Sequence, residues 1–422
     1  MENYNQIIMS LLNLTSNDIE SIIVGEKKIK VSLVNSDTKC RYCGSHKIVS
    51  KGYYQRKCFV PIGILDGYEV ILKTKRFYCK ECMHSFANSK SIVPPQSNLS
   101  YKTILLIMDL LKEPSITFKQ AAELTGISET SVIRLFDKHI HINRNTLPEV
   151  ICVDEVYTKN TDYQDGKFSF IIYDFINRSI IDVVPTRRKY SLYSYFENIP
   201  EKERDNVKFI CMDMYFTYKL VAKKYFKKAI ICVDNFHVLK HLNDDLSKIR
   251  VHIMNRYNTK SQEYYLLKNF NFLLFDETIE LDNTAKFNKR FNRYLNYRDI
   301  LNMILSIDSD LYNGYKLRKL YYSFSRNMDE ENKLEMLNYI IDSFIASSIA
   351  EFDEFITILT NWKDEIINSF CTYNGKRINN SIAESINSTI KTLLFNTKGI
   401  RNHKRRRARI MYAVNKDSFS LK

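Results

Sequence analysis

The stretch VICVDEVY at residues 150–157 decides the fold that we expect for this chain of 422 residues. An apolar, β-prone run ends on Asp154, and a buried carboxylate is costly unless it is paired, hydrogen-bonded or metal-bound. The pattern recurs in VKFICMDMY (207–215), which carries Asp213, and in AIICVDNFH (229–237), which carries Asp234. Because ligands of α/β sheets bind beyond the carboxyl ends of the strands, these acids are predicted to converge.

Helical stretches and turns separate the strand-like runs between residues 148 and 237. Turns at Asp165-Gly166 and Asn177-Arg178 predict three antiparallel strands, followed by a helix, a strand, a helix and a strand. That is the order of a ribonuclease-H-like α/β core with a mixed sheet. Asp174 and Asp182 have polar neighbours and are expected to face solvent. Residues 238–372 form a long helical pattern, interpreted as an all-α insertion in which Trp362 packs in a core rather than stacking on a base.

The charge of the chain favours a polyanionic partner. The formal net charge is +15, and the surplus of basic residues lies in residues 1–150 and 376–422, with a nearly neutral middle. Such ends predict DNA binding, although a charge run can also be a solvated face. No apolar run reaches 18 residues and the N-terminus lacks a signal-peptide pattern, so we expect a cytoplasmic protein without a membrane partner.

The cysteine spacing predicts one structural Zn²⁺. Two CxxC pairs, Cys40 with Cys43 and Cys79 with Cys82, offer four thiolates to a tetrahedral ion. The β-like residues between the pairs suggest a zinc ribbon at 39–93 with an enlarged hairpin and a turn at Pro61-Ile62-Gly63. The rival ligands are Cys58, His46 and His84, and four incidental cysteines are the remaining alternative.

After a predicted linker at Pro94-Pro95, residues 98–147 have the pattern of a helix-turn-helix. Thr117 with Gln120 predicts a capping box, Gly126 the turn and Ser128 the next helix start. The expected inward positions are Ala122, Ile127, Val132 and Leu135. Glu129, Thr130, Ser131 and Arg134 would then face a DNA groove, unless this is an ordinary αα-hairpin.

The C-terminal part supplies one more acid and a basic run. A helix over Ser381–Phe395 places Glu384 on a polar face together with Asn387, Ser388 and Lys391. KGIRNHKRRRAR (398–409) follows, with seven basic residues and no acid. We predict DNA contacts for this run, a solubilising tail being the alternative. The predicted contact residues are Arg401, Lys404, Arg405, Arg406, Arg407 and Arg409.

Four motifs carry a resemblance to a known family. They are VDE at 153–155, CMDMY at 211–215, VDNFHVLKHL at 233–242, and NNSIAESINSTIK at 379–391 with its basic sequel. With the CxxC pairs and the helix-turn-helix, nearly the whole chain resembles a DDE transposase of the insertion-sequence L-three family. The resemblance implies cleavage and transfer of DNA strands at terminal inverted repeats. It implies a catalytic triad of Asp154, Asp213 and Glu384 that holds two Mg²⁺ or Mn²⁺ ions.

The resemblance also suggests a supporting set around the triad. Asp234, His237, Asn387 and Lys391 are the candidates. His237 either contacts the scissile phosphate or orients water, with a core or helix-capping histidine as the alternative. The expected partners are the double-stranded DNA of the element's ends and of the target. A homodimer or larger synaptic complex, associated with the bacterial nucleoid when bound to DNA, is also expected.

These expectations describe a multidomain α+β protein. The predicted order is an N-terminal segment (1–38), zinc ribbon (39–93), helix-turn-helix (98–147), first part of the catalytic core (148–237), insertion (238–372) and last part of the core (373–422). Two other functions remain open from the sequence. One is a non-catalytic DNA-binding regulator derived from a transposase, and the other is a structure-specific nuclease without strand transfer.

Overall fold

A computed structural model describes residues 6, 8–10, 12, 14–34, 37–61, 67–87, 93, 97–160, 166–327, 332–397 and 400–416. The chain forms two compact units, which we describe separately. The first comprises Met1–Arg144, Thr158–Lys167 and Ile386–Lys422, and the second comprises Asn145–Tyr157 and Phe168–Ser385. The predicted linker Pro94-Pro95, Asp165 of the first predicted turn, and Ile62 and Gly63 of the ribbon turn lie outside the described residues.

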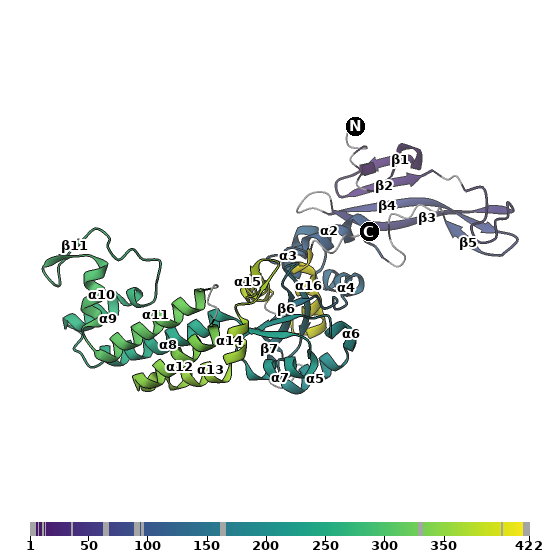
Figure 1. The fold of residues 1–422 in the computed structure, drawn as a ribbon. Coiled ribbons are helices and arrows are strands. Elements are labelled where there is room, and N and C mark those ends of the chain that lie inside the picture. Colours follow the sequence, from purple (N-terminus) through teal and green to yellow (C-terminus); the bar gives the residue numbers. More distant parts are fainter. Residues whose placement is uncertain are drawn as a thin grey trace. The chain divides into compact units, whose positions relative to one another are not determined.

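A five-stranded sheet forms the N-terminal part of the first unit (Figure 1). Its order is β1-β2-β4-β3, with β5 on β4, and β2 runs parallel to β4. Alternation along β2 buries Ile29, Val31 and Leu33 on one face. The sheet therefore continues across the predicted boundary at residue 38. The strands are β1 (Ile19–Val24), β2 (Lys28–Leu33), β3 (Ile48–Pro61), β4 (Gly67–Cys79) and β5 (Ser85–Ala87), and the 3-10 turn η1 (Ser16–Asp18) precedes them.

Four helices form the other core of the first unit. The capping box is confirmed, because Thr117 Oγ1 accepts from the Gln120 amide at 3.0 Å and Gln120 Oε1 accepts from the Thr117 amide at 2.9 Å. Gly126 ends the first helix of the motif with φ of 68°, and Ser128 caps the second, both as predicted. The helices are α2 (Tyr101–Leu110), α3 (Phe118–Thr125), α4 (Glu129–His139) and α16 (His403–Val414).

The second unit contains a five-stranded mixed sheet in the order β10-β9-β6-β7-β8. β10, β9 and β6 are parallel neighbours, while β7 and β8 form an antiparallel hairpin that turns at Asn177 and Arg178. The predicted order of elements is found, apart from one additional short helix, Glu201–Arg204, before the fourth strand. The elements are β6 (Val150–Asn160), β7 (Gly166–Asp174), β8 (Ser179–Val184), α5 (Lys189–Glu197), α6 (Glu201–Arg204), β9 (Phe209–Met212), α7 (Phe216–Tyr225) and β10 (Ile230–Val233).

A long helical segment follows β10. Gly314 on α11 allows close approach to α8, because a Cβ there would lie 3.1 Å from Leu246 Cδ1. The helices are α8 (Asn235–Met254), α9 (Gln262–Asn269), α10 (Tyr297–Leu305), α11 (Ser309–Arg326), α12 (Lys333–Ser347), α13 (Asp353–Asn361) and α14 (Lys363–Asn368), with 3-10 turns η2 (Asn271–Leu274) and η3 (Ala350–Phe352). A hairpin of two short strands, β13 (Thr372–Tyr373) and β14 (Lys376–Arg377), then leads to α15 (Ser381–Asn396).

The prediction that this segment is all-α is wrong at one place. Residues predicted as the start of a helix form a β-hairpin, β11 (Lys286–Asn288) and β12 (Arg293–Leu295). Asn292 takes a left-handed conformation with φ of 51°, which reverses the chain. Asn296 then caps α10 in a capping box with Asp299, so the helix begins later than its apolar periodicity suggested.

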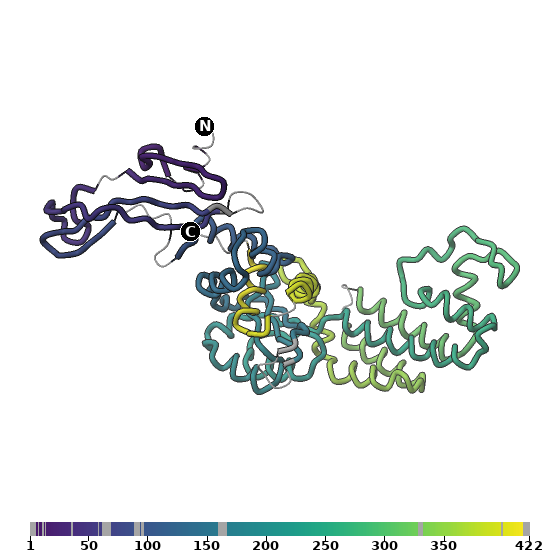
Figure 2. The backbone as a smooth tube through the Cα atoms, turned by 180° about the vertical axis from the view of Figure 1, so that it is seen from behind, coloured from purple at the N-terminus to yellow at the C-terminus, as the bar shows by residue number. Residues whose placement is uncertain are grey.

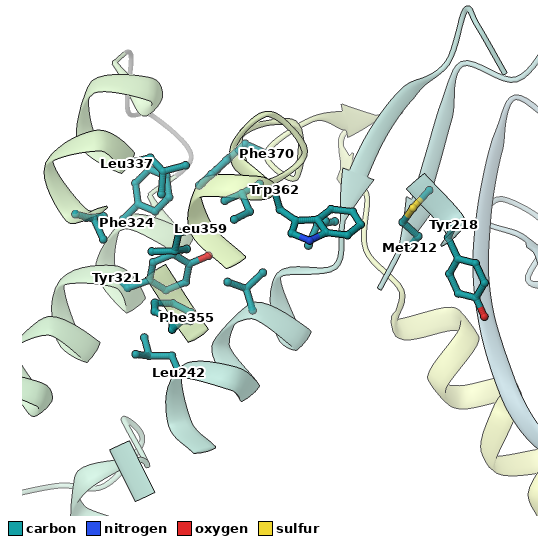
Figure 3. Close-up of a cluster of buried hydrophobic side chains, with 14 of the residues drawn as sticks. Met212, Tyr218, Leu242, Tyr321, Phe324, Leu337, Phe355, Leu359, Trp362 and Phe370 are labelled. Carbon is teal, nitrogen blue, oxygen red and sulfur yellow. The ribbon is translucent and has the colours of Figure 1, made fainter. Parts of the chain in front are cut away.

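Burial in the second unit settles the environment of three residues. Trp362 lies among the buried side chains in Figure 3, in the predicted packing role, and is 5% exposed. The expectation that Asp174 and Asp182 face solvent is wrong, because both are buried. Each has backbone and side-chain donors that satisfy it: Asp174 accepts from Asn177, and Asp182 accepts from Tyr195 and the Val183 amide. Among the described residues, no helix is both long and apolar enough to cross a membrane.

Candidate catalytic and DNA-binding sites

The register of the second sheet brings the three strand acids to one level. Cys152 pairs with Cys211, and Cys211 pairs with Cys232. Asp154, Asp213 and Asp234 each lie two residues further along. Since the three strands are parallel, the acids meet at one edge of the sheet. The strand β6 continues to Asn160, so Asp154 lies two residues beyond the last residue paired with β9 and not at the end of the strand.

A carboxylate cluster lies at this edge. Asp154, Glu155 and Asp213 each offer one carboxylate oxygen, and these oxygens lie within 4.8 Å of one another. Asp154 Oδ1 accepts from the Glu155 amide at 2.8 Å, and Asp213 Oδ1 accepts from the Tyr215 amide at 3.1 Å. Asp154 and Asp213 are therefore placed to offer carboxylate oxygens to one cation, and hard divalent ions such as Mg²⁺ prefer such ligands.

Glu155 is the member of the cluster that the sequence reasoning missed. Tyr218 donates to its Oε2 at 2.6 Å, and Arg187 forms an ion pair with it. Arg187 in turn lies over the rings of Phe168 and Tyr215, at 4.5 and 4.6 Å from their centroids. Neighbouring strand residues normally point to opposite faces, which hid Glu155. The adjacent acids in the VDE motif were the available signal.

Burial raises the pKa values of the two aspartates, so that without a bound cation the cluster holds protons near neutral pH. It raises the pKa of Asp154 to about 6, with a contribution from the charge of Glu155. It raises the pKa of Asp213 to about 7, and the charges of Glu155 and Asp154 act in the same direction. A cation at the cluster would replace these protons.

Binding of Mn²⁺ at the cluster should therefore depend on pH. Because both pKa values are raised in the folded protein, the metal-free cluster lowers stability as pH rises through 6 to 7. We expect millimolar Mn²⁺ to raise the melting temperature at about pH 8 and to have little effect at about pH 5.5, where protons compete. Thermal melts at both pH values check this. Equal shifts at both, or a full shift at pH 8 in Asp154→Asn, would contradict it.

Asp234 and His237 lie beside the cluster as a pair. Asp234 caps α8 by accepting from the Phe236 amide, and His237 Nδ1 lies 3.2 Å from its Oδ2. This hydrogen bond raises the pKa of His237, burial opposes the shift, and the charges of Asp213 and Asp154 add to it. The cap residue of α8 is thus Asp234 and not His237, and the same carboxylate orients the imidazole of His237.

Glu384 lies in the first turn of α15, outside the 4.8 Å cluster. Its side chain is exposed, whereas Asn387 is buried rather than on an open polar face and Lys391 is exposed. The residues before α15 contact β6: Asn380 Nδ2 donates to the Val153 carbonyl at 3.4 Å, and the Cys152 thiol donates to the Asn379 carbonyl at 3.4 Å. The start of α15 is therefore held beside the residue that precedes Asp154.

The two CxxC pairs form a second candidate metal site, in the first unit. The four Sγ atoms all lie within 4.8 Å of one another, and they belong to Cys40, Cys43, Cys79 and Cys82. The closest pairs are Cys40 with Cys82 at 3.5 Å and Cys43 with Cys79 at 3.6 Å. Tetrahedral zinc with Zn–S bonds of about 2.3 Å places thiolates roughly 3.8 Å apart, which fits this group.

The rival zinc ligands have other positions. Among the described side chains, neither His46 nor His84 belongs to the four-sulfur group, and His84 Nδ1 lies 2.6 Å from the Cys82 carbonyl. Cys58 lies in β3, opposite Val70.

The basic helix α16 differs from its predicted role. Arg406 and Arg409 are 2% and 0% exposed, so DNA contacts by these two residues, which need accessible guanidinium groups, are excluded in this structure. Arg406 donates to the Thr158 and Ile400 carbonyls, and Arg409 to the Glu113 and Ile116 carbonyls. The sequence showed seven basic residues in a run but not that the helix packs through Ala408 and Tyr412 on the helix-turn-helix.

The other basic residues of this region divide into two groups. Arg405 pairs with Asp137 of α4, and Arg407 donates to the Ile142 carbonyl at 2.7 Å. Arg401 and Lys404 are exposed. In α4 itself, Thr130 and Arg134 are exposed, while Ser131 is half-buried beside the cap residue Ser128.

This arrangement predicts different outcomes for two arginine-run variants. Arg409→Ala removes hydrogen bonds that join α16 to the connection before α3, and we expect it to lower stability by about 3 kcal/mol. Lys404→Ala should leave stability unchanged and lower the log-log salt slope of DNA binding by about 0.9 if Lys404 contacts one phosphate. Urea denaturation and salt titrations measure both quantities. A stable Arg409→Ala protein with a flatter slope would reverse these assignments.

The comparison with known families now adds to this geometry. A family model of DDE transposases of the insertion-sequence L-three type, described as Transposase, matches residues 151–410. The chain belongs to this transposase family. The match spans the strand acids, the helical segment, α15 and most of α16.

A curated transposase shows the same similarity at lower coverage. The transposase for insertion sequence element IS1001 of Bordetella parapertussis is 23% identical over 249 residues, which make up 57% of this chain and 55% of that protein. The chain thus spans about half the length of this relative.

Proposed function

We propose that this transposase binds the terminal inverted repeats of an insertion sequence and catalyses cleavage and transfer of DNA strands with two divalent ions. The observation that carries the proposal is the half-buried cluster of Asp154 and Asp213 at the edge of the second sheet. We propose that this sheet, with its hairpin followed by parallel strands, is a ribonuclease-H-like core.

The proposed metal ligands are Asp154, Asp213 and Glu384, as the family resemblance implies. When bound, two Mg²⁺ or Mn²⁺ ions activate the attacking oxygen and stabilise the leaving oxygen of a phosphodiester. Two half-buried aspartates whose carboxylate oxygens lie within 4.8 Å of each other support this donor set. The contacts of Asn379 and Asn380 with β6 support a place for Glu384 near Asp154, reached by movement of an exposed side chain.

His237 has a positioning role in this proposal. The hydrogen bond with Asp234 orients its ring and favours the protonated imidazole. A protonated imidazole beside the acids would attract the scissile phosphate. Glu155 would hold Arg187 and Tyr218 in place rather than act as the third metal ligand, because its carboxylate already has both partners.

DNA recognition in this proposal belongs to the first unit. A structural zinc ion at the four cysteines would order one end of the sheet, and Thr130 and Arg134 on α4 would contact a groove. Support comes from the confirmed caps and turn of α3 and α4, and from the packing of α16 behind them. The exposed Arg401 and Lys404 remain candidates for phosphate contacts.

A reaction with labelled ends tests the proposal. Full-length protein, Mg²⁺ and duplexes that carry the element's inverted repeats should yield nicks at the ends, and a target plasmid should gain the labelled strand. Binding without nicking would favour a regulator. Nicking without joining to the plasmid would favour a nuclease without strand transfer.

A further inference from the structure

The β11–β12 hairpin presents two aromatic rings to solvent. Phe287 and Tyr294 pair across the strands, with ring centroids 5.4 Å apart, and are 49% and 70% exposed. The hairpin lies at the end of the helical segment away from the five-stranded sheet of the same unit (Figure 1, Figure 2). The cross-strand contact covers only part of each ring, and exposed aromatic side chains gathered on one surface are candidates for contact with a ligand.

The hairpin is also strongly basic. Residues 286–294, KFNKRFNRY, contain four basic residues and no acid, within a middle region that is nearly neutral. Over the part of the chain that the structure describes, Lys286, Lys289, Arg290 and Arg293 have no carboxylate partner, while nearby Asp282 is paired with Arg298. The positive charge of the hairpin is therefore available to an anion.

The hairpin is fixed in place rather than loose. Arg290 donates to the Ser261 carbonyl at 3.2 Å, and Asn288 to the Tyr265 hydroxyl at 3.5 Å. The ring centroid of Phe291 lies 6.1 Å from that of Tyr265. Phe291 is partly buried against the core, unlike the exposed pair. The inner residues anchor the hairpin while the outer rings stay open.

A cavity of about 700 Å³ lies beside the hairpin. Its lining combines aromatic rings with cationic side chains, including Tyr265, Phe270, Tyr297, Lys286, Lys289 and Arg290. This volume is within the usual range for a small-molecule site, of about 300–1,000 Å³, and accommodates a nucleotide. Rings and cations together suit a base with its phosphate.

We infer that the β11–β12 hairpin is a second DNA-binding element, which takes unpaired nucleotides of a DNA strand. Paired bases in a duplex show only their edges in the grooves, so exposed rings gain from stacking only where a base is unstacked. Lys286 and Lys289 bind the phosphates, and Phe287 and Tyr294 stack on bases next to the cavity. The inference rests on the proposed function, because it takes DNA as the ligand.

Fluorescence anisotropy with full-length protein tests the inference. The probes are a labelled duplex and the same duplex with a single-stranded tail. The wild type should bind the tailed probe more tightly. Phe287→Ala/Tyr294→Ala should weaken binding of the tailed probe about tenfold or more, because stacking contributes on the order of 1–3 kcal/mol per base, and should leave duplex binding within about twofold.

Matched variants separate this effect from general changes in charge or surface. Lys286→Ala/Lys289→Ala should weaken tailed binding and flatten its salt dependence. Tyr312→Ala/Lys316→Ala removes another exposed ring with a lysine over it, 4.3 Å from the centroid on α11, and should change neither probe. Circular dichroism confirms that each variant is folded.

Three results would overturn the inference: equal wild-type affinity for both probes, unchanged tailed binding in Phe287→Ala/Tyr294→Ala, or an equal loss in Tyr312→Ala/Lys316→Ala. Photocrosslinking of an iodouracil-containing tail gives a second readout, with adducts expected in the peptide that contains Tyr294. End nicking by the wild type, measured separately, reports on the proposed function. Nicking with no role for the hairpin would remove only this inference.

Discussion

Asp154→Asn is expected to abolish nicking at the element's ends, with a loss of at least about a thousandfold, while DNA binding survives. Asp154 and Asp213 are the two proposed metal ligands within the cluster, and their carboxylate oxygens lie within 4.8 Å of each other. Removing one charge misplaces an ion that must act opposite another. Asp213→Asn should have the same effect. Gel-based nicking and binding assays on the same preparation check both.

Stability distinguishes this loss from misfolding. Burial raises the pKa of both aspartates, so their ionised forms destabilise the metal-free protein above about pH 7. The neutral amide of Asp154→Asn should therefore raise the melting temperature slightly at about pH 8 without metal. Glu197→Gln, an exposed acid at the end of α5, is a matched control and should nick normally. Wild-type nicking by Asp154→Asn would leave the regulator as the better function.

The third acid of the site is tested by a pair of variants. Glu384→Gln should abolish nicking with unchanged stability, because its side chain is exposed. Glu155→Gln should lower stability, because Glu155 holds Arg187 and Tyr218. If Glu384→Gln nicks normally and Glu155→Gln is stable and inactive, the third ligand is Glu155. Asp174 is another strand acid of this sheet, but Asp174→Ala is unsuitable as a control. Buried Asp174 accepts hydrogen bonds at the β7–β8 turn, so its loss would lower stability.

The local patterns of this chain predicted what depends on nearby residues. The capping box of Thr117 and Gln120 involves residues three apart, and the run before Asp213 specifies a buried strand by itself. The convergence of Asp154 and Asp213 also followed, since parallel strands with acids at the same position must meet. These features need only periodicity, caps and one rule of sheet topology.

Features that depend on distant packing did not follow from the sequence. Arg409 looks like any exposed cation in KRRRAR until α16 is placed against the carbonyls of Glu113 and Ile116. Asp182 is buried, and Tyr195 on the following helix donates a hydrogen bond to its carboxylate. The β11–β12 hairpin lies inside a helical pattern, and only the left-handed Asn292 reverses it. The first two cases depend on tertiary contacts, and the third on a left-handed backbone conformation inside a sequence with helical periodicity.

Loss of zinc is expected to have the largest effect on the first unit. The end of the sheet near the cysteines has a small core of its own, with Phe77 and Phe86 as its buried rings beside Cys40 and Cys79. Two rings bury too little apolar surface to balance the ordering of this part of the chain. A metal site in such a small core contributes folding energy directly, on the order of 10 kcal/mol in zinc-finger peptides.

Cys79→Ser/Cys82→Ser should therefore reduce bound zinc from about one ion per chain to none. Circular dichroism should show loss of strand signal, and binding to the inverted repeats should fall at least about a hundredfold, because residues near the cysteines no longer hold one conformation. Cys371→Ser, a half-buried cysteine of the second unit, should keep both zinc and binding. The apolar core around Val31 and Val70 has no sulfur ligand, so the β1–β2 end of the sheet should persist. Full zinc content in the double variant would show that the cysteine group binds no metal. The cysteine end of the β3–β4 pair would then need another source of stability.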